Sequence, residues 1–226
     1  EEDARVTLVE AGPELFPMFK PKLREYTAKA LADRTVEVLT GTAVASVSPT
    51  EITLKSGDVL RAHTLVWGAG LQGNPLVPSL GLELQRGNRI GVGPDLTLSG
   101  HPEVFVVGDV AAITDSKTNT VLPQLGSVAL QSGEHVGETI ARTVSGKATK
   151  PFAYRDKGTM AAIGRGAAVV QMLGGRTMTG KKAQLAWGTV HLALLPTNED
   201  RAKAIVDWAG AATTHQRPGR ITVEHS

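Results

Sequence analysis

The chain has 226 residues, of which 41% are hydrophobic and 20% are charged, and its formal net charge is +2. This is ordinary globular composition, and so small a net charge gives no sign of a nucleic-acid partner. The chain has no cysteine, which excludes disulfides, thiolate metal ligands and a dithiol redox centre within these residues.

The first half of the chain alternates between strand and helix patterns. RVTLVE predicts a strand over 5–10, the periodic run PKLREYTAKALAD predicts a helix over 21–33, and TVEVL predicts a second strand over 35–39. A small antiparallel region is expected next, and it ends with a strand over 63–70. Frequent Gly and Pro predict a loop-like segment over 71–102.

The second half repeats this alternation. EVFVVGD predicts a strand over 103–109, and the apolar face of the following periodic run predicts a helix over 124–146. The segment 158–180 is expected to form a β-hairpin, and helices are expected over 182–195 and 199–213. Strands that alternate with helices predict an α/β fold.

Glu10 ends the first predicted strand and is followed by Ala11 and Gly12. In a dinucleotide-binding unit, an acid at the tip of the second strand binds the adenosine ribose, and it favours NAD because a 2′-phosphate would be repelled. The glycine fingerprint of such a unit stands about 20 residues earlier, before residue 1. We therefore expect this chain to be the later part of a longer protein. A surface glutamate at a strand end explains Glu10 equally well.

One glycine motif looks like a phosphate-binding loop but lacks the required context. GAGLQG (68–73) is a literal G-x-G-x-x-G, yet Pro75 and Pro78 exclude the long helix that must follow it. We therefore do not expect it to bind phosphate. A strand that ends at Ala69 and Gly70 still allows a nucleotide to approach its backbone.

Other catalytic signatures are missing. GGRTMTGKK (174–182) matches most of a P-loop, but Lys182 stands where a Ser or Thr must ligate Mg²⁺. The six histidines include no pair four residues apart, and there is no G-x-S-x-G nucleophile motif. We expect neither a metal site nor a catalytic side chain.

Asp109 follows an apolar run and Gly108. A carboxylate at the carboxyl end of such a strand faces the crevice where α/β sheets bind ligands. A polyol suits it, because hydroxyl groups donate hydrogen bonds without charge repulsion. The commoner alternative is an aspartate that caps a turn.

These segments together resemble the FAD-dependent pyridine-nucleotide oxidoreductases, and among them the type II NADH dehydrogenases (NADH:quinone oxidoreductases) of actinobacterial kind. VTLVEAGPELFP resembles a strand of the NADH domain, LVWGAG the exit from that domain, and VFVVGDVAA the second FAD motif. LPQLGSVALQSGEHVGETI resembles the helix beside the flavin, and YRDKGTMAAIGR the segment after the FAD domain. WGTVHLALLPTNEDRAKAIVDW resembles the membrane-associating C-terminal region.

The resemblance implies partial FAD/NAD(P)-binding domains of the three-layer, Rossmann-like type, followed by a hairpin and helices. The implied divisions are residues 1–73 in the NADH domain, 74–150 in the FAD domain and 151–226 in the C-terminal region. The implied activity is electron transfer from NADH through FAD to a membrane quinone, without proton pumping. In such a protein the flavin carries the chemistry.

The resemblance also implies roles for individual residues. Gly108 and Asp109 are expected to bind FAD, and Glu10, Ala69 and Gly70 are expected to bind NADH.

Three further residues are expected at the flavin and the quinone. Gln131 is placed near both, and Ser127 is placed near the quinone. The family usually has Ala-Gln where Gly126-Ser127 stands here. Lys157 is expected to be a charged group near the flavin ring, and a surface hairpin lysine is its alternative.

The C-terminal region is expected to touch a membrane without crossing it. No stretch reaches the roughly 20 apolar residues that a membrane-spanning helix needs. The apolar run 183–196 has basic flanks, so residues 181–208 are expected to lie on the cytoplasmic face of the cell membrane. Packing of this run on its own domain, or on the partner of a homodimer, is the alternative.

Two alternatives to this function stay open from the sequence alone. One is a non-catalytic flavoprotein fragment, and the other is another flavin-dependent reductase whose acceptor is a protein.

Overall fold

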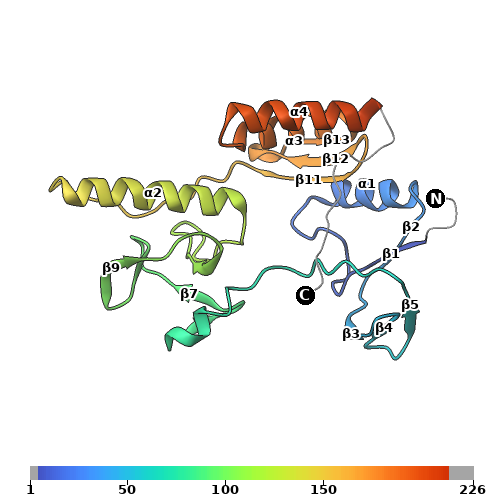
Figure 1. Ribbon diagram of the computed structural model, residues 1–226, viewed down its shortest axis with the longest axis horizontal. Helices are drawn as coiled ribbons and strands as arrows, with labels where there is room; N and C mark the ends of the chain where they lie inside the picture. The colour runs from blue at the N-terminus through green and yellow to red at the C-terminus, as the bar shows by residue number, and fades with distance from the viewer. Residues whose placement is uncertain (1–4, 214–226) are drawn as a thin grey trace. The chain divides into compact units, whose positions relative to one another are not determined.

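The computed structural model describes residues 5–213, and the chain forms two compact units. Among the described residues, the first unit comprises 5–64 together with 158–213, and the second comprises Leu65–Lys157. Both units combine helices with small sheets (Figure 1). This is the α/β class that the sequence predicts.

The first unit begins with two parallel strands joined by a helix. β1 (Val6–Val9) pairs with β2 (Val36–Leu39), and α1 (Pro21–Ala32) connects them. Pro21 lies in the first turn of α1, where a missing N–H costs no hydrogen bond. This arrangement places Glu10 directly after the carboxyl end of β1.

A three-stranded antiparallel meander follows. It consists of β3 (Val44–Val47), β4 (Glu51–Leu54) and β5 (Val59–Arg61), with β4 in the middle. Ile52 and Leu54 of β4 are buried, so the meander has a small apolar face of its own.

A second antiparallel sheet completes the first unit. It comprises β11 (Thr159–Gly164), β12 (Ala167–Gln171) and β13 (Thr177–Thr179), with β12 in the middle. The sequence predicts only a hairpin over this stretch, and the structure adds β13 as a third strand. The remaining elements of the unit are η3 (Leu173–Gly175), α3 (Gly180–Leu194) and α4 (Asn198–Thr213).

Helices α1 and α3 cover opposite faces of β12. Val169 packs against Phe19 and Leu23 on the α1 side. Ala168, whose side chain points the other way, packs against Ala183 on the α3 side. Successive residues of a strand point to opposite faces, so burial of both faces explains why β12 reads as a continuous small apolar run.

The second unit is built from short strands that pack against α2 (Gly126–Val144). β7 lies between β6, to which it is antiparallel, and β10, to which it is parallel, and β8 pairs with β9. Val128 and Val136 of α2 share a core with Ile90 and Val106. The other elements are η1 (Val77–Leu80), β6 (Leu84–Gln85), β7 (Arg89–Gly91), β8 (Thr97–Leu98), β9 (His101–Phe105), η2 (Gly108–Val110) and β10 (Ala111–Ala112).

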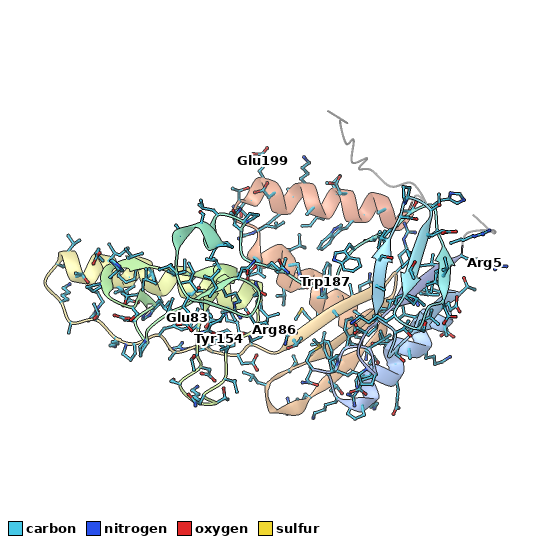
Figure 2. The ribbon with its side chains drawn as sticks, turned by 90° about the horizontal axis from the view of Figure 1, so that it is seen from below. Arg5, Glu83, Arg86, Tyr154, Trp187 and Glu199 are labelled. Carbon is cyan, nitrogen blue, oxygen red and sulfur yellow. The ribbon has the colours of Figure 1, made fainter. Side chains whose placement is uncertain are left out.

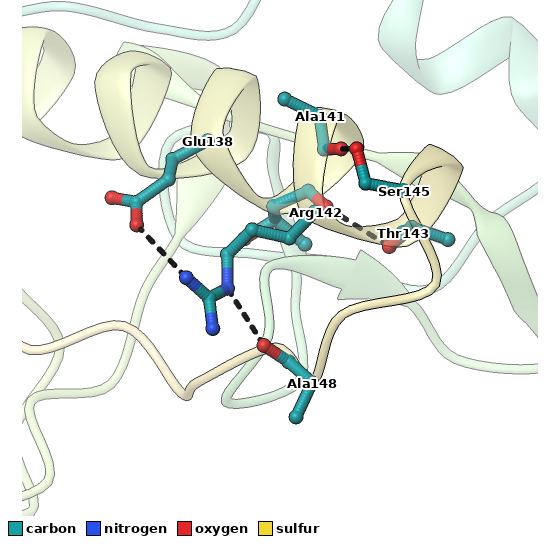
Figure 3. A network of polar contacts seen from close by, with 7 residues as sticks. Glu138, Ala141, Arg142, Thr143, Ser145 and Ala148 are labelled. Carbon is teal, nitrogen blue, oxygen red and sulfur yellow. Dashed lines mark hydrogen bonds and ion pairs between the residues drawn. The ribbon is translucent and has the colours of Figure 1, made fainter.

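The C-terminal end of α2 is held by Arg142 (Figure 3). Its Nε donates a 2.6 Å hydrogen bond to the carbonyl of Ala148, and its Nη1 lies 3.7 Å from a carboxylate oxygen of Glu138. Ser145 donates to the carbonyl of Ala141 in the preceding turn. These contacts tie the last turn of α2 to the chain that follows it, because Ala148 lies beyond the end of the helix.

Two predictions about secondary structure are corrected. The strand predicted over 63–70 is wrong, because none of the described strands pairs with this segment, and Val66 is 86% exposed. An apolar run becomes a strand only where a neighbour takes up its N–H and C=O groups. The loop expected over 71–102 contains the short strands β6, β7 and β8 instead.

The last glycine of GAGLQG is required by packing. A Cβ on Gly73 would clash with the backbone carbonyl of Asn88, whereas a Cβ on Gly68 would meet nothing within 4 Å. We expect Gly73→Ala to lower the free energy of unfolding by about 1–3 kcal/mol, the usual cost of overpacking, and Gly68→Ala to change it by less than about 0.5 kcal/mol. Urea denaturation measures both, and equal effects would show that the glycine spacing has another cause.

Candidate functional site

The Gly108–Asp109 turn is fixed from helix α2. Gly108 has a φ of +71°, a left-handed conformation that favours glycine. Its N–H donates a 3.1 Å hydrogen bond to the hydroxyl of Ser132, which in turn donates to the carbonyl of Ala129 at 2.9 Å. Ser132 is fully buried, so the turn has one defined position against the helix.

Two more side chains bind the backbone after this turn. Gln124 Nε2 donates to the carbonyl of Asp109 at 2.9 Å. Arg89 Nη2 donates to the carbonyls of Ala111 at 2.6 Å and Leu122 at 3.1 Å. Together with Ser132, these contacts hold the backbone of residues 108–111 at three points.

Arg89 is a buried cation close to Asp109. It is 8% exposed, and its Nε is buried without a hydrogen-bond partner among residues 5–213. Burial lowers the pKa of Arg89, and the charge of Asp109 opposes that shift. The carboxylate of Asp109 therefore interacts favourably with the buried guanidinium of Arg89.

The carboxylate of Asp109 itself is exposed and accepts no hydrogen bond from the described residues. Its backbone is fixed while its side chain is free to bind. A braced acceptor of this kind fits the hydroxyl groups of a flexible polyol such as the ribityl chain of FAD, because each hydroxyl donates one hydrogen bond. Gly108 has no side chain to cover the adjacent backbone, which therefore stays accessible to a ligand. A Cβ at this position would meet only Ala129.

The segment that follows the second unit's helix runs back along α2. Ser127 and Tyr154 share a 2.9 Å hydrogen bond between their hydroxyls (Figure 2 labels Tyr154). Gln131 Nε2 donates to the carbonyl of Arg155, and its Oε1 accepts from the N–H of the same residue, both at 3.1 Å. Two of the residues expected near the quinone thus bind the protein's own chain.

A shallow cavity of about 290 Å³ lies between α2 and this segment. Lys157, predicted near the flavin ring, lines it and is exposed. Gln131 lines it as well. The other lining residues are Glu134, His135, Glu138, Phe152, Ala153 and Arg155.

In the first unit, Glu10 is ordered by its own turn. Its N–H donates to the carbonyl of Leu39 on β2 at 2.8 Å, and its Oε1 accepts a 2.6 Å hydrogen bond from the N–H of Gly12. A Cβ on Gly12 would lie 3.1 Å from that oxygen, so glycine makes room for the carboxylate. Glu10 is half-buried at the carboxyl end of β1, where parallel strands present ligand-binding groups.

Ala69 and Gly70 belong to the second unit and are exposed. Gly70 has a φ of +104°, and no atom lies within 4 Å of the position where its Cβ would stand. The backbone at Gly70 is therefore accessible, as the sequence predicts, although no strand directly precedes it.

Sequence reasoning did not identify several residues that hold the Asp109 turn. Ser132 is a polar position on the largely apolar face of α2, and this break in the apolar pattern is the feature of the sequence that points to it. Arg89 and Gln124 lie in segments without periodicity, so no sequence signal linked them to the turn.

A model of the pyridine nucleotide-disulphide oxidoreductase family matches residues 2–133 of the chain. The chain belongs to this family. The match includes Glu10, the GAGLQG segment and the braced Asp109 turn. Members of the family share a fold, so this assignment agrees with the partial FAD/NAD(P)-binding architecture expected from the sequence.

Curated relatives carry the name that the resemblance implies. The chain is 38% identical over 184 residues to the type II NADH:quinone oxidoreductase of Staphylococcus haemolyticus, covering 79% of this chain and 45% of that protein. It is 33% identical over 231 residues to the type II NADH:quinone oxidoreductase Ndh of Mycobacterium tuberculosis, covering 97% and 48%. These names confirm the resemblance to the type II NADH dehydrogenases. The chain spans about half the length of the curated relatives it matches.

A solved structure confirms the fold class. The chain superimposes on NDH2 from Plasmodium falciparum in complex with NADH with a TM-score of 0.83 at 15% identity, covering 95% of this chain and 59% of that one. At this identity the likeness concerns the fold alone.

Helices α3 and α4 combine internal packing with an apolar surface. Trp187 stacks on His191, with ring centroids 3.9 Å apart, and lies 6.0 Å from Trp208 (Figure 2 labels Trp187). Leu185 is 74% and Val206 70% exposed. No helix between residues 5 and 213 is both long enough and apolar enough to cross a membrane.

Proposed function

We propose that the protein containing this chain passes electrons from NADH through FAD to a membrane quinone, without proton pumping. The observation that carries the proposal is the Asp109 turn, whose backbone is held at three points while its carboxylate stays exposed. The names of the curated relatives support it.

The residues of this chain have binding and orienting roles in that proposal. Asp109 accepts hydrogen bonds from the ribityl hydroxyls, and Gly108 lets the cofactor approach the backbone. When bound, FAD supplies the chemistry of accepting a hydride and releasing electrons. Glu10 binds the adenosine ribose of NADH, and Ala69 and Gly70 present bare backbone to the nucleotide.

The quinone and the membrane are assigned to the C-terminal half of the chain. Ser127, Gln131 and Lys157 lie along one side of α2, and we assign the acceptor end of the flavin to this side. The exposed apolar residues of α3 and α4, with basic flanks within 181–208, support binding to the cytoplasmic membrane surface. A homodimer that buries the same residues is the competing arrangement.

The function is tested on the purified full-length protein. We expect a flavin absorbance spectrum, and NADH oxidation that depends on a short-chain quinone. A ferredoxin-like acceptor in the same assay tests a protein-linked reductase. A colourless protein that does not oxidise NADH would overturn the proposal, and faster reduction of the protein carrier than of the quinone would replace it.

Glu10 is expected to set the choice of nucleotide. Glu10→Gln keeps an oxygen that accepts the N–H of Gly12 but removes the charge that repels a 2′-phosphate. We expect the preference for NADH over NADPH, as the ratio of kcat/KM values, to fall by about tenfold or more. Glu37→Gln, an exposed neighbour on β2, is the matched control and should leave the ratio unchanged. An unchanged ratio in Glu10→Gln would remove Glu10 from the nucleotide site.

A further inference from the structure

The segment 152–157 has no regular secondary structure, so its position depends on individual contacts. Phe152 donates its N–H to the carbonyl of Pro94 at 2.8 Å, and its ring forms a T-shaped contact with the ring of His135 at a centroid distance of 5.4 Å. These contacts fix the beginning of the segment. Its end, with Arg155 and Lys157, is exposed.

Gln131 holds the segment at Arg155. Its amide meets both polar groups of the Arg155 backbone, donating to the carbonyl and accepting from the N–H, each at 3.1 Å. Ser127 lies four residues earlier on α2 and therefore on the same face. Its hydroxyl bonds that of Tyr154 at 2.9 Å. Two consecutive residues of the segment are thus attached to two consecutive turns of one helix.

We propose that Gln131 is a positioning residue that holds Arg155 and Lys157 beside α2. The proposal rests on the function proposed above, and it assigns Gln131 an action through the segment rather than through contact with the quinone. Both sides of its amide are engaged with Arg155. The cation of Lys157 is two residues further along, so loss of the clamp removes one of the contacts that set the position of this charge.

A correctly placed cation matters to electron transfer because the acceptor end of the site becomes more negative as electrons arrive. A fixed positive charge stabilises that state without reorganisation. Misplacement by about 1 Å typically costs up to about 100-fold in rate. The clamp therefore has a kinetic consequence that simple loss of helix stability would not have.

Two substitutions in the full-length protein test this, with a matched control. Gln131→Leu removes both hydrogen bonds at similar size. Gln131→Glu keeps the acceptor, and at low pH its protonated carboxyl also donates, which restores the glutamine pattern. Glu134→Gln changes an exposed residue on the same helix and lining the same cavity.

The first measurement is hydrogen exchange at the Arg155 amide, which needs neither cofactor nor activity. We expect Gln131→Leu to speed its exchange by about tenfold, the factor expected for losing a hydrogen bond of roughly average strength, and Glu134→Gln to leave it unchanged. The second measurement is quinone turnover, with kcat expected to fall by about 10- to 100-fold while the KM for NADH and the flavin content stay constant.

The pH profile gives the sharpest outcome. Turnover in Gln131→Glu should recover as pH falls through the pKa of the new carboxyl, and Gln131→Leu should show no such recovery. The charged and titratable groups that face the same cavity are Glu134, His135, Glu138, Arg155 and Lys157. These groups are common to all variants, so a titration seen only in Gln131→Glu belongs to the introduced carboxyl.

Unchanged exchange at Arg155 in Gln131→Leu would overturn the clamp. Faster exchange with unchanged quinone turnover would overturn the positioning role. If the parent protein reduces no quinone, the proposed function fails. The positioning role is then decided by exchange at Arg155 together with the visible circular dichroism of bound flavin, which should change in Gln131→Leu and recover at low pH in Gln131→Glu.

Discussion

Replacing Arg89 by methionine is expected to lower the free energy of unfolding by about 2–4 kcal/mol. Methionine keeps much of the apolar stem but has no donor for the carbonyls of Ala111 and Leu122, which Arg89 Nη2 now binds. Buried carbonyls without a partner retain the full cost of their desolvation. Urea denaturation of the full-length protein, monitored by far-ultraviolet circular dichroism, measures the change.

Arg86→Met is the matched control for this effect. Arg86 lies three residues earlier and is exposed (Figure 2), so its replacement should change the free energy by less than about 0.5 kcal/mol. Arg89→Lys keeps the charge but presents a single ammonium to two carbonyls, and we expect an intermediate loss. Equal stability of Arg89→Met and the parent would show that the two carbonyls find other donors.

The charge of Arg89 also connects the core to the site. Asp109 raises the pKa of Arg89 against the lowering caused by burial, so the two groups stabilise each other. In a double-mutant cycle, removal of Asp109 should therefore cost less once Arg89 is already methionine. A coupling of this sign would connect the bracing of the turn with the charge that we propose binds the flavin.

The elements predicted well are those whose periodicity is complete within one segment. Proline at the start of α1 and its apolar stripe predict that helix within one residue of its observed end. The apolar face of α2 predicts that helix equally well, because Val128 and Val136 both pack in the core. Local propensity and tertiary packing agree in these helices, so the sequence pattern is sufficient.

The errors arise where structure depends on a distant partner. The apolar residues at 63–70 have the composition of a strand. Strand pairing depends on two segments, however, and cannot be read from one of them alone. The same holds for β7, whose pairing with β6 and β10 was hidden in a Gly- and Pro-rich stretch.

The residues of the candidate site also differ in whether the sequence alone identifies them. Asp109 could be identified because a carboxylate after an apolar run is conspicuous in a sequence, although β9 itself ends at Phe105. The side chains that hold its backbone come from β7, from the chain before α2 and from α2 itself, and nothing in their spacing connects them. Gln131 was identified as important from the resemblance, but its hydrogen bonds to the backbone of Arg155 were visible only in the fold.

Asp109→Ala is expected to weaken flavin binding by about 10- to 150-fold, the factor that corresponds to losing hydrogen bonds to a charged acceptor. The carboxylate is exposed and accepts no hydrogen bond from a described residue, so the fold should persist with only the small loss of the charge interaction with Arg89. The ratio of flavin to protein absorbance after purification, and titration of the apoprotein with FAD, measure the change.

Asp109→Asn separates geometry from charge in the same position. Its amide keeps one oxygen acceptor but no negative charge, so it should bind flavin with an affinity between those of the parent and Asp109→Ala. Glu103→Gln, an exposed change on β9 shortly before the turn, should leave flavin binding unaltered. If Asp109→Ala retained the parent's flavin content and affinity, the braced turn would be a structural feature alone, and the observation that carries the proposed function would be lost.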